Sequence, residues 1–272
     1  MPSGKSSRQR RQAAKTPPPV RARGTRGRRQ ASPRVLIAGG VVAVGVVVAI
    51  VLGVMVRSGS SSNSLGNVPA VGSLSGGLPG ASAVNTLFKG IPQHGTTLGR
   101  ASAPVTMVEF IDPQCPYCQE FETQVMPSII KKQVRSGRLR IVMQPWAFIG
   151  PDSVRGQAAL LAAAKQNRAF NYAALLYDNQ GVENTGWLND AMVAAVAKSI
   201  PGMKVPTLLS TRSSGAVKAA QQRVDELATT DQVTGTPTLF VGKTGTKGRE
   251  VQLASPTDKA AVVAAINAAA AS

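Results

Sequence analysis

The chain has 272 residues, a formal net charge of +18, two cysteines and one histidine. Two thiols and one imidazole are too few for a structural zinc site, which needs about four ligands. The charge does not identify a nucleic-acid-binding protein either. Eleven of the 31 Lys and Arg residues precede residue 35, and the chain after Arg57 has 19 basic residues against 13 acidic ones.

The first 34 residues form a basic tail with eleven Lys or Arg, no Asp or Glu, and three consecutive prolines at Pro17 to Pro19. Few apolar side chains are available to offset the entropy of ordering, so we predict a disordered segment. Such a tail could bind anionic lipid or nucleic acid. We interpret it instead as an orientation signal on the cytoplasmic side of a membrane, and we expect no nucleic-acid partner.

Residues 35–56, "VLIAGGVVAVGVVVAIVLGVMV", contain no charged side chain over 22 positions. At about 1.5 Å per residue this length crosses a bilayer core of roughly 30 Å, which predicts a transmembrane helix. A cleavable signal peptide is the alternative, but its apolar region usually runs about 7 to 15 residues. The basic residues before the span predict a single-pass signal-anchor in the cell membrane, with the N-terminus cytoplasmic and the domain that follows extracytoplasmic, where disulfides persist.

Residues 57–84 are rich in Ser, Gly and Asn and lack a sustained apolar period. They predict a flexible linker with a root-mean-square reach of roughly 25 to 30 Å. A single α/β domain is expected to follow over residues 85–272.

The domain begins with two apolar segments typical of buried strands, "APVTMVEFI" at 103–111 and "RLRIVMQPW" at 138–146. Between them a helical stretch is expected to reach about Val134, with a kink at Pro127. Strand, helix and strand in this order predict a parallel crossover.

The next section, about residues 152–229, is Ala-rich and carries apolar residues at helical spacing. We expect about four helices there, as an insertion. "GTPTLFVG" and "REVQLA" then predict paired strands, and "DKAAVVAAINAAAA" predicts a closing helix.

Both cysteines lie in Cys115-Pro116-Tyr117-Cys118, directly after the first predicted strand. A structural disulfide across a two-residue spacer constrains the unfolded chain very little, so we interpret the pair as a redox dithiol. Pro116 suits the first position of a helix, which makes Cys115 the N-cap residue. The helix dipole then favours its thiolate and lowers its pKa. Cys118 is expected to point inward, so that an exposed acidic thiol stands beside a shielded one.

The segment "APVTMVEFIDPQCPYCQEF" resembles the active-site segment of the membrane-anchored bacterial DsbA-like thiol:disulfide oxidoreductases, in the thioredoxin superfamily. "GTPTLF" at 235–240 is similar to the cis-proline loop of that family. The resemblance implies a thioredoxin-like fold with a helical insertion, preceded by one transmembrane helix. It also implies that Pro237 is cis and lies against the cysteines, and that Pro116, Tyr117 and Thr236 contact the substrate. An ordinary turn proline is the alternative.

Glu109 and His94 are two further titratable residues of the predicted domain. Glu109 interrupts an apolar strand six residues before Cys115, and a buried carboxylate is costly unless its pKa shifts or it finds a partner. The resemblance implies that Glu109 relays protons to the inner cysteine; an exposed strand position is the alternative. His94, the single histidine, lies in a Gly-flanked loop, and we do not expect it to form a protease-type pair with Cys115.

The resulting hypothesis is an enzyme that forms disulfides in exported protein thiols and is reoxidised, as the resemblance implies, by a membrane quinone-linked oxidase. No metal or other cofactor is expected. A disulfide reductase or isomerase, such as one serving cytochrome maturation, is the alternative within redox chemistry, because spacing does not set direction. A non-catalytic thioredoxin-like binding module is the alternative outside it. A glutaredoxin is disfavoured by the predicted span and insertion.

Overall fold

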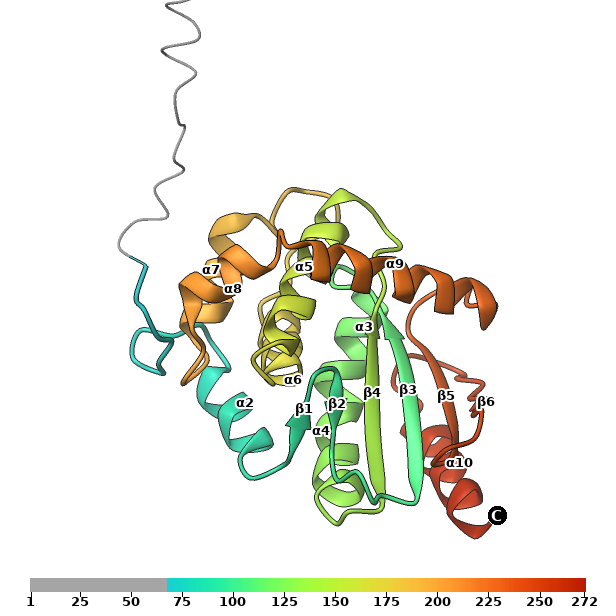
Figure 1. The fold of residues 1–272 in the computed structure, drawn as a ribbon. Coiled ribbons are helices and arrows are strands. Elements are labelled where there is room, and N and C mark those ends of the chain that lie inside the picture. Colours follow the sequence, from blue (N-terminus) through green and yellow to red (C-terminus); the bar gives the residue numbers. More distant parts are fainter. Residues whose placement is uncertain (1–67) are drawn as a thin grey trace, which may run out of the picture. The chain divides into compact units, whose positions relative to one another are not determined.

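The computed structural model describes residues 68–272 (Figure 1). The predicted basic tail, transmembrane helix and first part of the linker lie outside the described residues. Among the helices of residues 68–272, none combines the length and apolarity that a bilayer crossing requires.

A six-stranded sheet, in the order β1-β2-β4-β3-β5-β6, forms the centre of the described domain. Its strands are β1 (Gln93–His94), β2 (Thr97–Leu98), β3 (Val105–Ile111), β4 (Leu139–Pro145), β5 (Thr238–Lys243) and β6 (Arg249–Glu250). The predicted parallel crossover is confirmed, because β3 and β4 pair in parallel from Val105↔Leu139 to Ile111↔Pro145. The predicted pairing of the last two strands is also confirmed, and β5 runs antiparallel to β3 on its other side.

The crossover helix consists of α3 (Pro116–Glu120), η1 (Phe121–Val125), α4 (Met126–Ile129) and η2 (Ile130–Val134) without a break. The predicted end at Val134 is confirmed. Pro127 stands in the first turn of α4 and has no N–H to donate, and the preceding turn is π-helical, with Met126 N–H bonded to the carbonyl oxygen of Phe121. The irregularity expected at this proline is therefore a widened helical turn.

The insertion contains five helices where about four were expected: α5 (Pro151–Ala164), α6 (Ala169–Asp178), α7 (Asp190–Lys198), α8 (Val205–Thr211) and α9 (Gly215–Thr230). The additional helix is α8, which has seven residues and is too short to display a helical apolar period. The predicted closing helix is confirmed as α10 (Lys259–Ala271).

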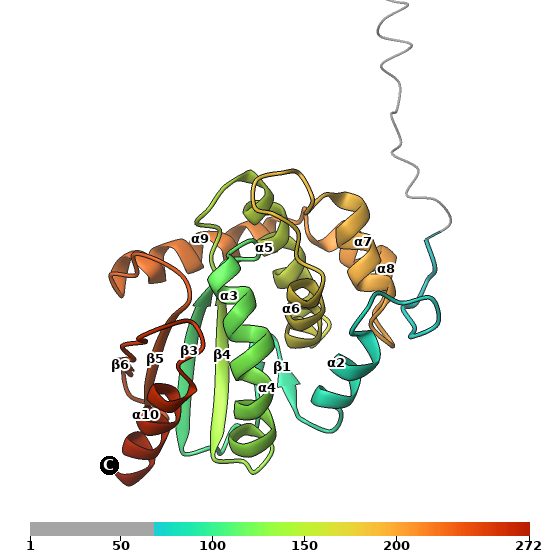
Figure 2. The ribbon, with the colours of Figure 1, turned by 180° about the vertical axis from the view of Figure 1, so that it is seen from behind.

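The helices are arranged around the sheet in two groups (Figures 1 and 2). The crossover helix and α10 lie on the same face of the sheet, in front of it in Figure 2. The insertion lies at the end where β3 and β4 finish, so its helices surround the point at which the chain leaves β3 for the cysteine pair.

The prediction of a flexible linker is wrong for the described part of that segment, residues 68–84. The N–H of Gly72 donates to the carbonyl oxygen of Met203 at 2.8 Å, and Val71 pairs with Lys204 in an antiparallel bridge. A Cβ at Gly72 would collide with the carbonyl oxygens of Ile200 and Ala197, so glycine permits this close approach. The chain then enters α2 (Ala81–Phe88), which packs on α6. The small residues that predicted a flexible linker instead allow the backbone of this segment to pack closely against the domain.

Candidate active site

The loop after β3 is anchored by Asp112, a buried carboxylate with four hydrogen bonds. Its Oδ1 accepts from the N–H of Gln114 and the hydroxyl of Ser153, both at 2.7 Å. Its Oδ2 accepts from the N–H groups of Phe148 (2.7 Å) and Ile149 (2.8 Å). Sequence reasoning treated Asp112 only as a strand break. Its hydrogen bonds fix the start of the cysteine segment to the loop after β4 and to α5.

The helical insertion also forms hydrogen bonds with Gln114, the residue before the first cysteine. Gln180 donates from Nε2 to the carbonyl oxygen of Gln114 at 2.7 Å, and the N–H of Asn184 donates to its Oε1 at 2.9 Å. The insertion therefore forms one wall of the site, and partners 66 and 70 residues away explain why the sequence did not reveal it.

Cys115 is the N-cap of α3 and Pro116 is at its first position, as predicted. The sulfur accepts a hydrogen bond from the N–H of Cys118 at 3.4 Å. The hydrogen bond with the Cys118 side chain contributes most to lowering the pKa of Cys115 from 9.0 to about 6, against an opposing effect of burial. The hydrogen bond with Thr236 and those with the N–H groups of Cys118 and Tyr117 lower it further. The thiolate is thus favoured by local donors at the helix start.

The expected difference in exposure between the two cysteines is smaller than predicted. Cys115 is only 4% exposed, because the loop bearing Thr236 covers it, whereas Cys118 is 0% exposed. The prediction that Cys115 is openly exposed is wrong, and the prediction that Cys118 points inward is confirmed. The exposed neighbour is Tyr117, at 59%. The two residues that follow Cys115, Pro116 and Tyr117, are thus the exposed part of the motif.

Cys118 has the opposite electrostatic environment. Burial, followed by the hydrogen bond and charge of Cys115, raises the pKa of Cys118 well above its usual range. Both thiols are free in this structure. One sulfur is therefore poised as an anion and its neighbour as a neutral thiol, which is the asymmetry that directed disulfide exchange requires.

The Thr236-Pro237 peptide bond is cis, as the resemblance implied. The Thr236 carbonyl oxygen accepts a hydrogen bond from the Cys115 sulfur at 3.3 Å, across 121 residues of sequence. The structure thus brings the two motifs together. The contact of Thr236 with a substrate remains a prediction.

Glu109 is 0% exposed, so the alternative of an exposed strand position is wrong. Its sheet neighbours are Met143 on β4 and Leu239 on β5, and neither carboxyl oxygen has a hydrogen-bond partner among the described residues. Burial, and secondarily the charge of Glu122, raises the pKa of Glu109 well above its usual range. Burial therefore favours the protonated, neutral form of this carboxyl group.

Sequence reasoning missed two buried groups near the sulfurs. Glu122 lies four residues after Cys118, and burial raises its pKa from 4.5 to about 8. Tyr177 on α6 donates from its hydroxyl to the carbonyl oxygen of Asp112 at 2.9 Å, where the N–H of Cys115 also donates. The spacing of Glu122 from Cys118 was a usable signal, because residues four apart share a helix face. No local sequence pattern indicated that Tyr177 belongs to the site. His94 is exposed on β1, separated from β3 by two strands.

Comparison with known proteins agrees with this geometry. A family described as "Thioredoxin" matches residues 93–267. A probable disulfide bond formation protein D of Bacillus cereus is 28% identical over 148 residues, covering 53% of this chain and 68% of that protein. Disulfide bond formation protein D of Bacillus subtilis is 25% identical over 146 residues, covering 53% and 66%.

Solved structures give the same fold. Oxidised BdbD from Bacillus subtilis superposes with a TM-score of 0.58 at 21% identity, covering 67% of this chain and 98% of that one. Alpha-DsbA1 from Wolbachia pipientis gives a TM-score of 0.53 at 17% identity, covering 65% and 90%. These likenesses show that the described domain shares its fold with both structures.

Proposed function

The chain belongs to the thioredoxin family as a DsbA-like thiol:disulfide oxidoreductase, and we propose that it works as an oxidant that forms disulfides in exported proteins. The observation that carries the proposal is the asymmetry of the two sulfurs. Cys115 has a pKa lowered to about 6, while burial keeps Cys118 neutral. A pair whose reduced form contains a stabilised thiolate is a stronger oxidant.

The reaction starts from the Cys115–Cys118 disulfide. A substrate thiolate attacks the Cys115 sulfur, the disulfide breaks, and Cys118 leaves and takes up a proton. A second substrate thiolate then attacks the substrate sulfur of the mixed disulfide and releases Cys115 as a thiolate. The substrate loses two electrons, which the cysteine pair gains, and one of the two substrate thiol protons is released in net terms.

The lowered pKa makes Cys115 a good leaving group in the second step. At pH 7 a thiol with a pKa of about 6 is roughly nine-tenths thiolate. Tyr117 supplies no positive charge, so local hydrogen bonds provide this stabilisation. These bonds are made with groups of α3 and with Thr236, which lies on the cis-proline loop.

Substrate binding is assigned to the face on which Tyr117 is exposed. We place Pro116, Tyr117 and Thr236 in contact with an extended segment of an exported protein, beside the cis Pro237. The predicted anchor at residues 35–56 would hold the domain on the extracytoplasmic side of the cell membrane. There a membrane quinone-linked oxidase would reoxidise the pair.

The experiment that tests the direction of the chemistry is equilibration of residues 68–272 with glutathione mixtures. We expect a reduction potential clearly less negative than about −270 mV, the value for thioredoxin. A potential near that of thioredoxin would contradict the oxidant and favour a reductase or isomerase.

The binding-module alternative is tested by oxidation of a reduced, unfolded substrate. Cys115→Ser and Cys118→Ser should both abolish turnover, because neither variant can form the Cys115–Cys118 disulfide that accepts the two electrons of the substrate. Unchanged turnover in Cys115→Ser would mean that the thiols are idle and that the chain binds without catalysis.

A further inference from the structure

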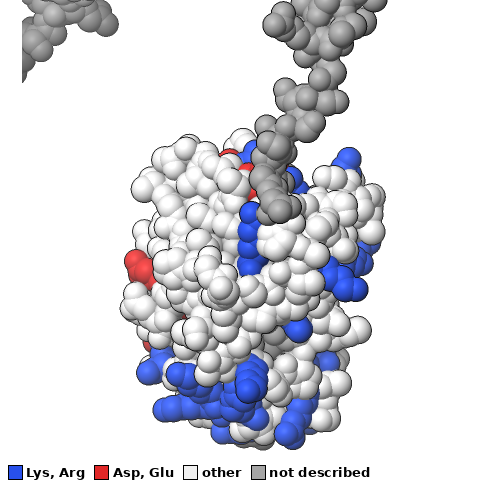
Figure 3. Space-filling model, turned by 90° about the vertical axis from the view of Figure 1, so that its left-hand side faces the viewer, with Lys and Arg blue, Asp and Glu red and all other residues white. Residues whose placement is uncertain are grey.

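Basic side chains gather on the side of the domain that carries α2, α7 and α8. Figure 3 faces this side and shows Lys and Arg gathered at its lower end, with few Asp or Glu in view. Within residues 68–272, none of the ion pairs involves the six cations that we call the basic face. The basic face consists of Lys89, Lys131, Arg135, Arg168, Lys198 and Lys204. Their charge is therefore available to an anion from outside the domain.

The basic face begins where the first described residues dock on the domain. The N–H of Ser73 donates to the carbonyl oxygen of Lys198 at 2.8 Å, and Val71 pairs with Lys204 in the antiparallel bridge. Two cations thus lie directly beside the docked segment. The side of the domain that the chain enters is the side that carries the positive charge.

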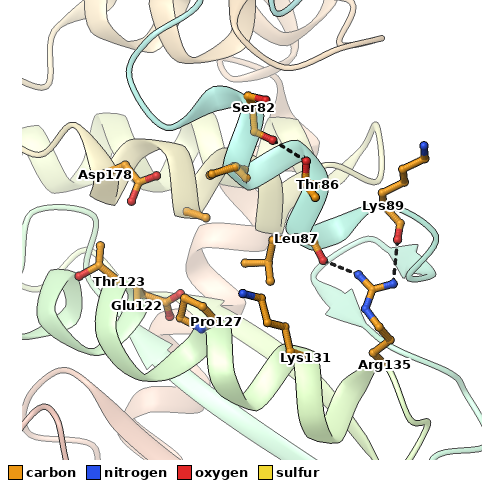
Figure 4. A pocket seen from close by; sticks show the side chains of 13 residues that line it. Ser82, Thr86, Leu87, Lys89, Glu122, Thr123, Pro127, Lys131, Arg135 and Asp178 are labelled. Carbon is orange, nitrogen blue, oxygen red and sulfur yellow. Dashed lines mark hydrogen bonds between the residues drawn. The ribbon is translucent and has the colours of Figure 1, made fainter.

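Two pockets continue the basic face past α2. Arg168 and Lys89 line the first, of about 270 Å³, together with Pro201 from the loop between α7 and α8. Lys89 also lines the second, of about 910 Å³, with Lys131 and Arg135. Figure 4 shows Lys131 and Arg135 extending from the crossover helix toward α2 and Lys89. The cations therefore form one band from the docked segment to the end of the crossover helix.

Two cations of the band occupy positions that helix electrostatics disfavour. Arg168 is the N-cap of α6 and Lys204 is the N-cap of α8, and neither side chain caps its helix. The helix dipole opposes a positive charge at this end. Lys131 and Arg135 differ, because they lie at the C-terminal end of the crossover helix, where the dipole favours them. The charges of Arg168 and Lys204 thus give their helices no stability, and a bound anion would offset their cost.

The acidic groups that face the band oppose an anion only weakly. In the described residues, Glu122 and Asp178 are the acids that line the larger pocket. Glu122 is buried, and burial raises its pKa from 4.5 to about 8, which favours its neutral form at pH 7. Asp178 is exposed and stands against the three cations that line the same pocket.

Exposed apolar side chains beside the cations distinguish a lipid surface from other anions. Val71 is 51% exposed and Leu74 is 41% exposed, and both belong to the segment docked beside Lys198 and Lys204. Apolar side chains next to basic ones suit the boundary between anionic headgroups and acyl chains. A nucleic-acid backbone would engage the cations and leave these two side chains in water.

The length of chain before the domain is compatible with this partner. Residues 57–67 separate the end of the predicted span, Val56, from Val68. A chain extends by at most about 3.6 Å per residue, so these residues cover at most about 40 Å. A span at residues 35–56 would keep Val68, and the basic face that begins beside it, within that distance of the bilayer.

We propose that the basic face docks on the anionic lipid headgroups of the cell membrane, with Val71 and Leu74 at the boundary of the acyl chains. Docking of this kind goes beyond the proposed redox function and is independent of the direction of disulfide exchange. None of the six cations belongs to the Cys115-to-Cys118 motif. Docking therefore orients the domain on the membrane without occupying the motif.

Tryptophan quenching in the full chain, reconstituted in vesicles, tests the docking. Leu74→Trp places a fluorophore beside the basic face, and Ala264→Trp places one at an exposed position of α10, across the sheet from α2 in Figure 1. Lipids brominated on their acyl chains should quench Leu74→Trp in vesicles of phosphatidylglycerol and phosphatidylcholine. They should not quench Ala264→Trp. In pure phosphatidylcholine, or in about 1 M salt, the quenching of Leu74→Trp should disappear.

Removal of charge from the basic face should release the domain. The triple variant Lys89→Gln, Lys131→Gln, Lys204→Gln loses three exposed cations and is made in the chain that carries Leu74→Trp. Each Lys near an anionic surface contributes a factor of about five, so the ratio of docked to undocked domain should fall on the order of 10²-fold. The quenching of Leu74→Trp should fall accordingly.

A second triple variant keeps the net charge the same and changes only its place. Lys218→Gln, Lys243→Gln and Lys259→Gln remove three exposed cations from α9, β5 and α10. This variant should retain the quenching of Leu74→Trp. Equal losses in the two triple variants would mean that net charge, and not the basic face, attracts the domain to lipid, and would overturn the proposal.

Three further outcomes would overturn the docking. They are equal quenching of Leu74→Trp and Ala264→Trp, quenching that does not depend on lipid charge, and no quenching in anionic vesicles, which would leave the cations to an acidic protein or a nucleic acid. Peptide oxidation by the same vesicles separates this proposal from the redox function. A chain that docks but does not oxidise the peptide would contradict the redox function alone.

Discussion

Cys115 and Cys118 have opposite electrostatic environments, although they lie one helical turn apart. On the side of Cys115, hydrogen bonds with α3 and with Thr236 stabilise a charge. Cys118, Glu109 and Glu122 are buried, and within residues 68–272 both carboxyl oxygens of Glu109 and one of Glu122 lack a hydrogen-bond partner, so charge is disfavoured on these groups. The contrast teaches that hydrogen bonds lower the pKa of the reactive sulfur, whereas burial raises the pKa of the resting sulfur. Each prediction below removes one element of this contrast.

The largest effect is expected from removing the anchor on the Cys115 side. Asp112→Ala leaves the N–H groups of Phe148 and Ile149 and the hydroxyl of Ser153 without their acceptor. Orphaned buried partners cost about 1 to 3 kcal/mol each, so the free energy of unfolding should fall by about 3 kcal/mol or more. Urea unfolding measures it. Asp231→Asn is the control, because Asp231 pairs with the exposed Lys247 and should cost under about 1 kcal/mol. Equal losses would contradict the assignment.

The next effect concerns the buried acids and the pH dependence of stability. Glu109 and Glu122 both have higher pKa values in the folded state than in the unfolded chain, so the folded state binds more protons. Stability from this source is greatest below about pH 4.5 and falls as pH rises, for Glu122 until about pH 8. The wild-type domain should therefore be less stable at pH 8 than at pH 5, by a few kcal/mol at about 1.4 per pKa unit.

Glu109→Gln should flatten this dependence by replacing the acid with a neutral amide. Urea unfolding at pH 5 and pH 8 makes the comparison, with Glu120→Gln as the exposed control that keeps the wild-type slope. A wild-type domain whose stability is level between the two pH values would mean that the buried acids ionise freely.

The smallest effect is expected at the hydroxyl that ties the insertion to the active-site loop. Tyr177→Phe removes the 2.9 Å hydrogen bond to the carbonyl oxygen of Asp112, which keeps its second donor, the N–H of Cys115. We expect a loss of about 1 kcal/mol in stability and a slower oxidation step. Tyr172→Phe is the matched control, because its hydroxyl bonds to Val193 at 3.0 Å inside the insertion. It should lose similar stability and keep the wild-type rate. Similar rates in both variants would place Tyr177 outside the redox function.

The sequence predicted what depends on local pattern. Apolar runs predicted β3 and β4, and Pro116 after Cys115 predicted the N-cap, because both signals lie within a few residues. The sequence did not predict the docking of residues 68–84, because Gly and Ser are equally common in flexible linkers and in segments whose backbone packs closely against another.

The site residues divide in the same way. Glu109 was identified because a carboxylate in an apolar strand is conspicuous. Tyr177, Gln180 and Asn184 were missed because they reach the cysteine segment from 65 to 70 residues away. The covering of Cys115 by the Thr236 loop is a tertiary effect of the same kind, since the two residues are 121 positions apart.

That separation has a consequence for the chain while it is being made. A nascent polypeptide that has emerged only as far as α9 already carries both sulfurs, Asp112 and Tyr177, yet it lacks β5 and the Thr236 carbonyl that bonds Cys115. Contacts of such high sequence separation form late. The groups of α3 that lower the Cys115 pKa are thus available before the covering loop is made, so the reactive sulfur is less shielded in the partly made chain than in the folded domain.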